Sequence, residues 1–361
     1  MSKLPPVRVV RAATSVRTGL QALTRRMVPP EVGLLELTSG FMATHAVYAA
    51  ARLGVADALA GEARTAKDVA VELGTSADAT YRLLRVCAAA GLFREDDEGR
   101  FALTPLGATL RSDSPDSMRS VVLMIGDPRY QAVWGQLPEA VTSGGPRAEE
   151  VHGVSMWALL DRDPDYAETF HDAMTRLTSL DWPTVEAAYD FTPFGTIVDV
   201  GGGHGQLLAL MLGAAPAADG VLLEQASLIP GAEQRLRAAG LLSRCRLEGG
   251  SFFDTAPDDG DLYVLRRVIH DFDDDQAVAL LANLRRHMPT GATLLLMESV
   301  VPPGNEPHLA KSLDLDMLLF VGGRERTEAE YDAVLRSAGF RMTRIVPTIS
   351  TISLVEARPV G

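Results

Sequence analysis

Cysteine and aromatic residues are scarce in this chain of 361 residues, which contains two cysteines and 6% aromatic residues. Cys87 and Cys245 lie far apart and lack the spacing of metal ligands, so we interpret both as buried thiols rather than as a disulfide or a metal site. Long apolar runs are also lacking, because no stretch approaches the ~18 unbroken apolar residues that span a membrane. The sequence therefore predicts a cytoplasmic protein without a membrane partner.

Positive charge is in deficit as well. The 34 Lys and Arg residues against 47 Asp and Glu residues give a formal net charge of −13, which disfavours nucleic acid as a partner over most of the surface. The stretch before Pro29 is the exception, since it carries basic residues and no acidic one. It lacks a clean apolar core and a cleavage site of small residues, so we expect a frayed or partner-docked arm rather than a membrane-surface helix or a targeting segment.

The chain is longer than the size at which one hydrophobic core usually keeps growing, so we expect two domains, at 1–112 and 113–361. The first has the pattern of a winged-helix module. Apolar residues recur at helical spacing until Gly54 interrupts them, and Thr65 and Ser76 can each cap a short helix. The acidic turn REDDEGR then separates two strand-like runs, as a wing requires.

A winged helix raises the question of DNA binding. Its second helix offers only Arg82 and Arg85 as basic side chains, and its wing is mostly acidic. We therefore favour protein–protein packing, and keep a DNA-binding regulator as the alternative function of a different class.

The helical section at 113–194 is the part of the chain richest in large, soft side chains. Core packing is the better interpretation for any one of them. As a set they could line a flat apolar pocket, which proteins favour at domain interfaces. With two residues from later in the chain, the candidates for a pocket that suits a planar compound are Met124, Trp134, Phe170, Met174, Met317 and Phe320.

Strand and helix patterns alternate after residue 195. The strand-like runs lie at 196–200, 221–223, 262–265 and 293–297, and the helical stretches at 205–213, 230–240 and 274–288. This alternation encodes a parallel sheet with helices on both faces, an α/β fold. Two further runs, RMTRIVPT and ISLVEAR, are close enough to pair as an edge hairpin.

The stretch TIVDVGGGHGQ places bare backbone between the first of these strands and its helix. Backbone N–H groups at a helix N-terminus face whatever binds there. The third glycine of a dinucleotide fingerprint would fall on Gln206, so an NAD or FAD site loses most of its support. Glu224, at the end of the second strand, lies where a carboxylate can accept hydrogen bonds from both ribose hydroxyls. The turn and this acid together indicate a nucleoside site.

Four motifs in order, VDVGGGHG, VLRRVIHDFDDD, LLLMESVVPP and GGRERTEAEYDAVLRSAGF, resemble those of the class I methyltransferases that use S-adenosylmethionine. More narrowly, the chain resembles the small-molecule O-methyltransferases of plant phenolic and bacterial polyketide pathways over nearly its whole length. The resemblance implies an all-α winged-helix dimerisation domain, a Rossmann-like catalytic domain and a homodimer. It also implies S-adenosyl-L-methionine as cofactor, S-adenosyl-L-homocysteine as product, and an aromatic or polyketide-like hydroxyl compound as acceptor.

The resemblance also implies which residues bind the cofactor. Gly201 and Gly203 would face its amino acid end, and Glu224 would bind the ribose. Ser251 stands where relatives commonly have an aspartate that binds the adenine amine, so a weaker serine hydrogen bond or Asp254 is expected there. The implied set, of which the last two residues would close over the cofactor, is Asp199, Gly201, Gly203, Glu224, Gln225, Ser251, Phe252, Phe253, Arg266, Met174 and Thr178.

A general base is expected at His270. A phenol attacks a sulfonium methyl group well only as it loses its proton. Transfer of that proton from a phenol (pKa ~10) to an ordinary histidine (pKa ~6.5) is uphill by ~5 kcal/mol in water, and a neighbouring sulfonium reduces the difference by favouring the phenolate. The resemblance places Glu298 and Glu325 beside His270, where a carboxylate can fix the tautomer and support the imidazolium.

The acids after His270 could be read as a magnesium cluster. We favour helix capping for Asp273, Asp274 and Asp275, because the dipole of the following helix stabilises acids in its first turn. Asp271 is expected in the substrate pocket, and no metal is expected. A decarboxylase or hydroxylase that keeps the cofactor is the alternative reaction, because the fold fixes the cofactor more than the chemistry.

Overall fold

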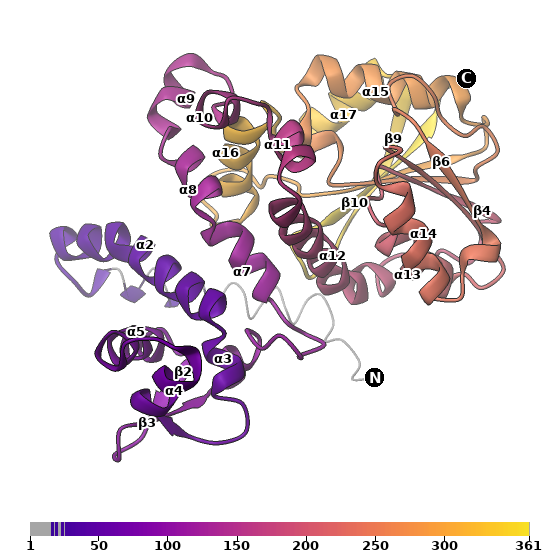
Figure 1. Cartoon of the computed structure of the whole chain (residues 1–361). Coiled ribbons are helices and arrows are strands. Elements are labelled where there is room, and N and C mark those ends of the chain that lie inside the picture. Colours follow the sequence, from indigo (N-terminus) through magenta and orange to yellow (C-terminus); the bar gives the residue numbers. More distant parts are fainter. Residues whose placement is uncertain (1–15, 18, 21–22, 25, 361) are drawn as a thin grey trace. The chain divides into compact units, whose positions relative to one another are not determined.

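The computed structural model describes residues 16–17, 19–20, 23–24 and 26–360, and its contacts divide the chain into two compact units (Figure 1). Within the described residues, the helical unit comprises 16–132 and 160–177, and the sheet unit comprises 133–159 and 178–360. The section at 113–194, which we expected to belong wholly to the second domain, thus contributes to both. Much of the expected basic arm, including residues 1–15, lies outside the described residues.

The helical unit begins with α2 (Pro30–Leu53), which starts at a proline and ends at Gly54 in the left-handed conformation (φ 76°). Thr65 accepts a hydrogen bond from the backbone N–H of Asp68, and Ser76 accepts one from Ala79, so the two expected caps are confirmed. The unit continues through α3 (Val55–Ala58), β1 (Arg64–Thr65), α4 (Ala66–Leu73), α5 (Ala77–Ala89), β2 (Phe93–Glu95), β3 (Arg100–Leu103), α6 (Pro105–Ala108), α7 (Arg119–Gly126) and most of α8 (Pro128–Trp134).

The wing is a small sheet rather than a bare loop. β3 pairs antiparallel with β2, as predicted, and also with the two-residue strand β1, which the sequence analysis did not foresee. The basic side chains of α5 interact within their own helix, because Arg82 pairs with Asp78 at 2.9 Å and the Arg85 guanidinium lies 5.0 Å from the centre of the Tyr81 ring.

The sheet unit contains seven strands in the order β6-β5-β4-β7-β8-β10-β9. The first five are parallel, and β10 runs antiparallel to both of its neighbours, so the sheet is mixed and the predicted hairpin is confirmed. The strands are β4 (Thr196–Val200), β5 (Asp219–Glu224), β6 (Cys245–Gly249), β7 (Leu262–Arg266), β8 (Thr293–Glu298), β9 (Phe340–Pro347) and β10 (Ser353–Pro359). β6 was not predicted.

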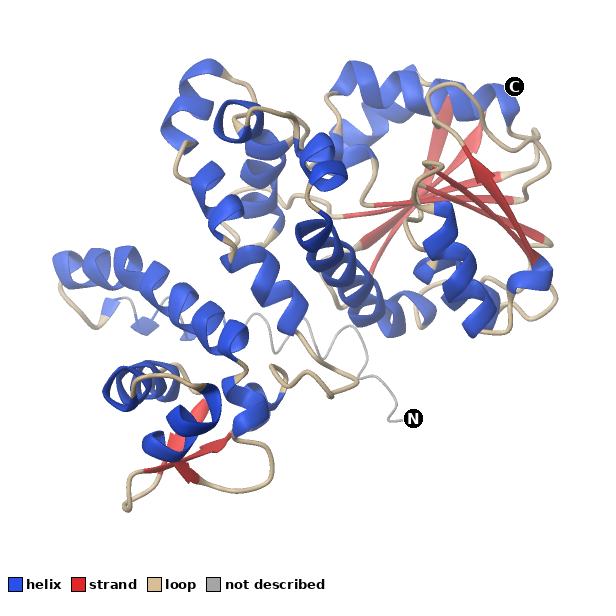
Figure 2. Ribbon diagram, in the orientation of Figure 1, coloured by secondary structure: helices blue, strands red, loops and turns tan. Residues whose placement is uncertain are grey.

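Helices cover both faces of this sheet (Figure 2). The helices that follow the strands are α13 (Gln206–Ala214), α14 (Ile229–Ala238), α15 (Asp274–His287), α16 (Ala310–Phe320) and α17 (Glu328–Ser337). The preceding part of the chain adds α9 (Leu137–Ser143), α10 (Ala148–His152), α11 (Met156–Arg162) and α12 (Pro164–Glu186), of which α11 and α12 are each divided between the two units. None of the described helices is long and apolar enough to cross a membrane.

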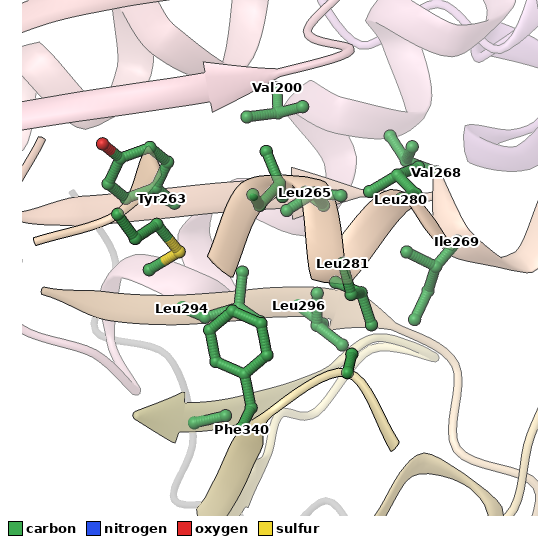
Figure 3. Packing of buried hydrophobic residues seen from close by; sticks show 14 of the residues in the cluster. Val200, Tyr263, Leu265, Val268, Ile269, Leu280, Leu281, Leu294, Leu296 and Phe340 are labelled. Atoms are coloured by element: carbon green, nitrogen blue, oxygen red, sulfur yellow. The ribbon is translucent and has the colours of Figure 1, made fainter. Parts of the chain in front are cut away.

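The core of the sheet unit extends up to the end of β7. On the face covered by α15 and α17, Leu265 and Leu296 pack with Leu280 and Leu281, and Val268 and Ile269 belong to the same buried cluster (Figure 3). Burying a leucine or isoleucine side chain contributes roughly 1.5–3 kcal/mol. The residues just after β7 are therefore held by the core, although they lie outside any strand.

The chain order reverses beside β4, which has β5 on one side and β7 on the other. Open α/β sheets bind their ligands at the carboxyl ends of the strands at such a switch point. A ligand site is therefore expected at the segments that follow β4 and β7.

The structure bears on two smaller predictions, the acidic cap of α15 and the burial of the two thiols. Asp273 is the N-cap of α15 and accepts a hydrogen bond from Gln276 at 2.8 Å, with Asp274 and Asp275 in the first turn, as predicted. Both cysteines are free. Cys87 is buried as predicted. Cys245 is only half-buried, because β6 is an edge strand of the sheet, so the predicted burial of this second thiol was partly wrong.

Candidate active site

The turn after β4 needs glycine at several positions. Gly201, Gly203 and Gly205 all have positive φ (71°, 56° and 73°), a conformation that other residues rarely adopt. A side chain on Gly202 would come within 2.2 Å of the Asp199 carboxylate, whereas nothing lies within 4 Å of the place where a Cβ on Gly203 would be. The backbone of this turn is bare and open at Gly203, as a ligand would require.

Glu224 fastens this turn to the end of β5. Its Oε2 accepts a hydrogen bond from the backbone N–H of Gly203 at 2.8 Å, and its Oε1 accepts one from Gln225 at 2.7 Å. Burial raises the pKa of Glu224 in spite of these two N–H donors. Burial, followed by the Glu224 charge, raises the pKa of the fully buried Asp199 to about 7. Two acids thus lie together beneath the turn and favour a ligand that donates hydrogen bonds or carries positive charge.

The segment after β6 borders the same turn. A Cβ on Gly201 would lie 3.6 Å from the ring of Phe252, which also packs edge-on against Phe272. The Ser251 hydroxyl accepts a hydrogen bond from the exposed Phe253 at 3.2 Å, and Asn283 on α15 donates to the Phe252 carbonyl at 2.9 Å. Ser251 is itself exposed. Asn283 anchors this loop and was not foreseen.

Arg266, at the end of β7, is engaged by a residue that the sequence analysis missed. Its guanidinium donates to Asp181 on α12 at 2.8 Å, and both side chains are buried. Burial and the neighbouring Arg267 charge lower the pKa of Arg266 to about 10 against the opposing effect of Asp181. Nearby, Gln206 at the start of α13 donates to Ser179 on α12 at 3.1 Å. The end of α12, which carries Thr178, is therefore fixed beside the start of α13.

The backbone is strained where β7 ends. Among the described residues other than glycine, Arg267 is the one with a positive φ, at 53°. Such conformations cost of order 1–3 kcal/mol and persist where the surroundings enforce them, often at functional sites. The strained residue lies three positions before His270.

His270 lies in the 3-10 turn Ile269–Asp271 and is surrounded by carboxylates. Its Nδ1 lies 3.0 Å from Glu325 Oε1 and 3.8 Å from Glu298 Oε2, and its Nε2 lies 3.5 Å from Asp271 Oδ1. Burial lowers the pKa of His270, but the charges of Glu298, Asp271 and Glu325 outweigh this effect and raise it to about 9. Burial raises the pKa of Asp271 to about 7. With Nδ1–H donated to Glu325, Nε2 is the nitrogen that can take a proton from a substrate.

The two glutamates beside His270 do different things. Glu325 makes the hydrogen bond to the ring, whereas Glu298 Oε1 accepts the backbone N–H groups of Val268 and Ile269 at 3.0 and 3.1 Å. Glu298 is fully buried, and burial raises its pKa. Glu298 therefore holds the turn on which His270 lies, and Glu325 orients the imidazole.

The glycine turn and the His270 turn lie side by side. A Cβ on Gly201 would come within 2.9 Å of Val268 Cγ2, which belongs to the segment that leads into His270. This contact follows from the pairing of β4 with β7 at the switch point. The sheet thus brings a bare backbone turn next to a buried, carboxylate-supported histidine.

Ligand atoms from His270, Glu298 and Glu325 all lie within 4.8 Å of one another, close enough for the three residues to be considered as a metal cluster. The hydrogen bond from His270 to Glu325 and the two backbone N–H groups on Glu298 account for this proximity without an ion. We read the cluster as a hydrogen-bonded one, and the expectation of no metal stays a prediction.

The expected pocket residues are divided between the two units. Met124, Phe170 and Met174 gather in a small cluster of the helical unit with Val121 and Ala173. The others belong to the sheet unit, where Trp134 Nε1 donates to Asp316 on α16 at 2.9 Å, and Met317 and Phe320 lie on the same helix. Each group is apolar, and a shared role in binding an acceptor stays a prediction.

Comparisons with known proteins bear directly on this arrangement. Residues 134–341 match the family model of an O-methyltransferase domain, and residues 35–113 match that of an O-methyltransferase dimerisation domain. The chain is 39% identical to a phenazine O-methyltransferase of Lysobacter antibioticus, over 92% of this chain and 97% of the relative. It is 37% identical to an 8-amino-8-demethylriboflavin N,N-dimethyltransferase of Streptomyces davaonensis, over 86% and 90%.

A solved structure carries the same fold with ligands bound. An O-methyltransferase from neocarzinostatin biosynthesis, in complex with S-adenosylmethionine and 2-hydroxy-5-methyl naphthoic acid, superposes with a TM-score of 0.76 at 35% identity, over 88% of this chain and 96% of that one.

Proposed function

Because this chain belongs to the family of S-adenosylmethionine-dependent O-methyltransferases, we propose that it methylates a hydroxyl group of an aromatic or polyketide-like compound with His270 as the general base. The observation that carries the proposal is the hydrogen bond from His270 Nδ1 to Glu325, in a turn that lies against the glycine turn. It leaves Nε2 as the basic atom. A hydroxyl needs such a base, because it becomes a good nucleophile only as it loses its proton.

The residues beneath the glycine turn fit the cofactor. S-adenosylmethionine supplies a methyl group on a positively charged sulfur, together with a ribose that donates two hydrogen bonds. We assign the ribose to Glu224, whose buried carboxylate ends β5, and the amino acid end to the backbone of the glycine turn at Gly201 and Gly203, which is open to a ligand at Gly203. Phe252 borders the turn and offers an apolar surface for a flat base. The buried acids complement the positive charge of the cofactor.

The carboxylates around His270 make proton transfer easier. In the cofactor-free protein these charges raise the pKa of His270 to about 9, closer to the ~10 of a phenol, so they reduce the cost of the transfer below the ~5 kcal/mol expected for an ordinary histidine. The same carboxylates keep the ring protonated at neutral pH before the cofactor binds. Cofactor binding adds positive charge and lowers this pKa, which frees Nε2 to act as base.

The pH dependence of the reaction tests this electrostatic account. We expect kcat/KM for the acceptor, at saturating cofactor, to rise with pH along a limb whose midpoint lies between ~6.5, the ordinary histidine value, and about 9. Glu325→Gln removes one of the charges that raise the pKa of His270, so its limb shifts to lower pH while its maximal rate falls. A limb that stays in place in this variant contradicts the assignment.

The acceptor can be found with a small panel and labelled S-adenosylmethionine. Suitable probes are 1-hydroxyphenazine, 3-amino-4-hydroxybenzoate and 1,4-dihydroxy-2-naphthoic acid, with 8-aminoflavin as a nitrogen acceptor. We expect products that gain one methyl group on oxygen, as identified by mass spectrometry and NMR. Methylation of nitrogen alone, or loss of carbon dioxide without methyl gain, contradicts the proposed reaction.

The surface of α2 supports a homodimer. Leu34, Leu37 and Phe41 follow one another at helical spacing and are 62%, 72% and 58% exposed, and Leu35 and Met42 beside them are also more than half exposed. We propose that a second copy of the chain covers this face.

The double variant Leu37→Glu/Phe41→Glu is expected to shift the protein from a dimer to a monomer of 38.7 kDa in light scattering after size exclusion. The reason is that burying four like charges at a two-fold interface is strongly unfavourable. Val71→Glu, which adds charge at an exposed valine of α4, serves as the control and should remain dimeric. A wild-type monomer, or an unchanged dimer in the double variant, would show that α2 is not the interface.

A further inference from the structure

We propose that Arg326 is a positioning residue for the base, because its buried guanidinium fixes the turn that carries His270. The proposal rests on the proposed role of His270 as the base, and it adds a residue whose part in the reaction lies in geometry rather than in contact with the reacting atoms.

The guanidinium of Arg326 binds both sides of the His270 turn. Its Nη1 donates to the carbonyl of Ile269 at 2.9 Å, and its Nη2 donates to the carbonyl of Phe272 at 2.9 Å. Its Nε donates to the Asp274 carboxylate, also at 2.9 Å, at the start of α15. The two carbonyls lie immediately before His270 and immediately after Asp271, so the turn is bound at its entry and at its exit.

The backbone next to Arg326 follows the same turn. The Arg324 N–H donates to the His270 carbonyl at 2.8 Å, and a side chain on Gly323 would collide with that carbonyl at 2.1 Å. Beyond it, the carbonyl of Arg326 accepts the N–H of Val301 at 2.9 Å, just past the strand that ends in Glu298. The segment 323–326 is therefore attached both to the His270 turn and to the chain that follows β8.

This attachment explains how the His270–Glu325 distance is set. Glu325 lies between two residues, Arg324 and Arg326, that are each hydrogen-bonded to the His270 turn. Glu298 binds the N–H groups at the start of the turn, and Arg326 binds its carbonyls. Two different side chains and the backbone N–H of Arg324 thus bind the donors and acceptors of the turn, which leaves its backbone little freedom to move the imidazole away from Glu325.

Burial of the Arg326 guanidinium would be costly without these hydrogen bonds. Arg326 is fully buried, and a guanidinium removed from water is tolerated only when its donors are hydrogen-bonded. Its charged partner Asp274 is itself 47% exposed, so ion pairing at the surface does not by itself account for a buried charge. The planar fork of arginine can hold two carbonyls and a carboxylate at fixed angles, whereas the compact ammonium of lysine cannot reach all three.

The test compares Arg326→Lys and Arg326→Met with Arg324→Gln, using the fastest acceptor of the panel above. Arg324→Gln is the matched control because it changes only a half-exposed side chain that pairs with the same Asp274, and keeps the backbone N–H that binds the His270 carbonyl. We expect Arg326→Met to lower kcat about 10- to 100-fold, the range for misplacing a catalytic group. The KM for the acceptor and the Kd for S-adenosylmethionine should stay within about threefold. Arg326→Lys should recover part of kcat, and Arg324→Gln should stay within about twofold of the wild type.

Calorimetric binding of S-adenosylmethionine checks that each variant is folded, and His270→Ala is measured in parallel. If His270→Ala keeps full turnover, the proposed function fails whatever Arg326 does. If His270→Ala is inactive while Arg326→Met or a folded Arg326→Lys keeps full kcat, only the positioning role is overturned. Loss of cofactor binding by both Arg326 variants, or a rise in KM without a fall in kcat, overturns it in favour of a general structural role.

Discussion

Replacing His270 by alanine is expected to lower kcat by roughly 10²–10⁴-fold, the usual contribution of a positioned general base, while the Kd for S-adenosylmethionine stays within about twofold. The hydrogen bond to Glu325 is made by Nδ1, which leaves Nε2, 3.5 Å from the Asp271 carboxylate, as the ring atom that takes the proton in the proposed reaction. The residues at the glycine turn that we propose for cofactor binding are untouched by the change. Turnover and calorimetric binding, measured on the same preparation, separate the two effects.

A matched control is available in His287, a partly buried histidine on α15 whose Nδ1 hydrogen-bonds the Asn283 carbonyl. His287→Ala should keep kcat within about twofold, so a general loss on removing any histidine would point to instability rather than to chemistry. Because Glu325 only orients and supports the ring, the kcat of Glu325→Gln should lie between those of the wild type and His270→Ala. Undiminished turnover in His270→Ala would remove this residue from the role of base.

The fold could be predicted where the chain carries its own local signal. The strands β4, β5, β7 and β8 are continuous apolar runs, since both faces of each are buried, and their helices begin and end at recognisable turns. β6 lacked that signal. Cys245–Gly249 is an edge strand with half-buried and exposed residues, so its sequence contains too little apolar character to distinguish it from a loop.

The site was predictable only in part, and the reason is distance along the chain. The resemblance was enough to place Glu298 and Glu325 beside His270. It did not show that Glu298 binds the backbone of the turn whereas Glu325 binds the imidazole. Asp181 is 85 residues from Arg266, and Arg326 is 57 residues from Ile269, so no local pattern could pair them. A buried arginine inside a recognised motif is indistinguishable in sequence from an exposed one.

Removing the carboxylate of Glu224 is expected to have the largest effect on cofactor affinity. Glu224→Ala should raise the Kd for S-adenosylmethionine by about 10²-fold or more, because hydrogen bonds to a charged group contribute roughly 1.5–3 kcal/mol each and 1.4 kcal/mol is tenfold in affinity. The same change leaves the N–H groups of Gly203 and Gln225 without the acceptor that now orders the turn. Calorimetric titration with S-adenosylhomocysteine gives the same comparison without turnover.

Two further variants separate the ribose contact from the ordering of the turn. Glu224→Gln keeps one oxygen as an acceptor but loses the charge, so its affinity should lie between the wild type and Glu224→Ala. Glu248, on the neighbouring strand β6, pairs with Arg246 at 2.6 Å and is the control, since Glu248→Gln should bind the cofactor as the wild type does. Because Asp199 also gains proton affinity from the Glu224 charge, loss of that charge lowers the pKa of Asp199 and leaves a more fully ionised acid beneath the turn. A Kd within twofold of the wild type in Glu224→Ala would mean that this remaining acid, and not Glu224, holds the nucleoside.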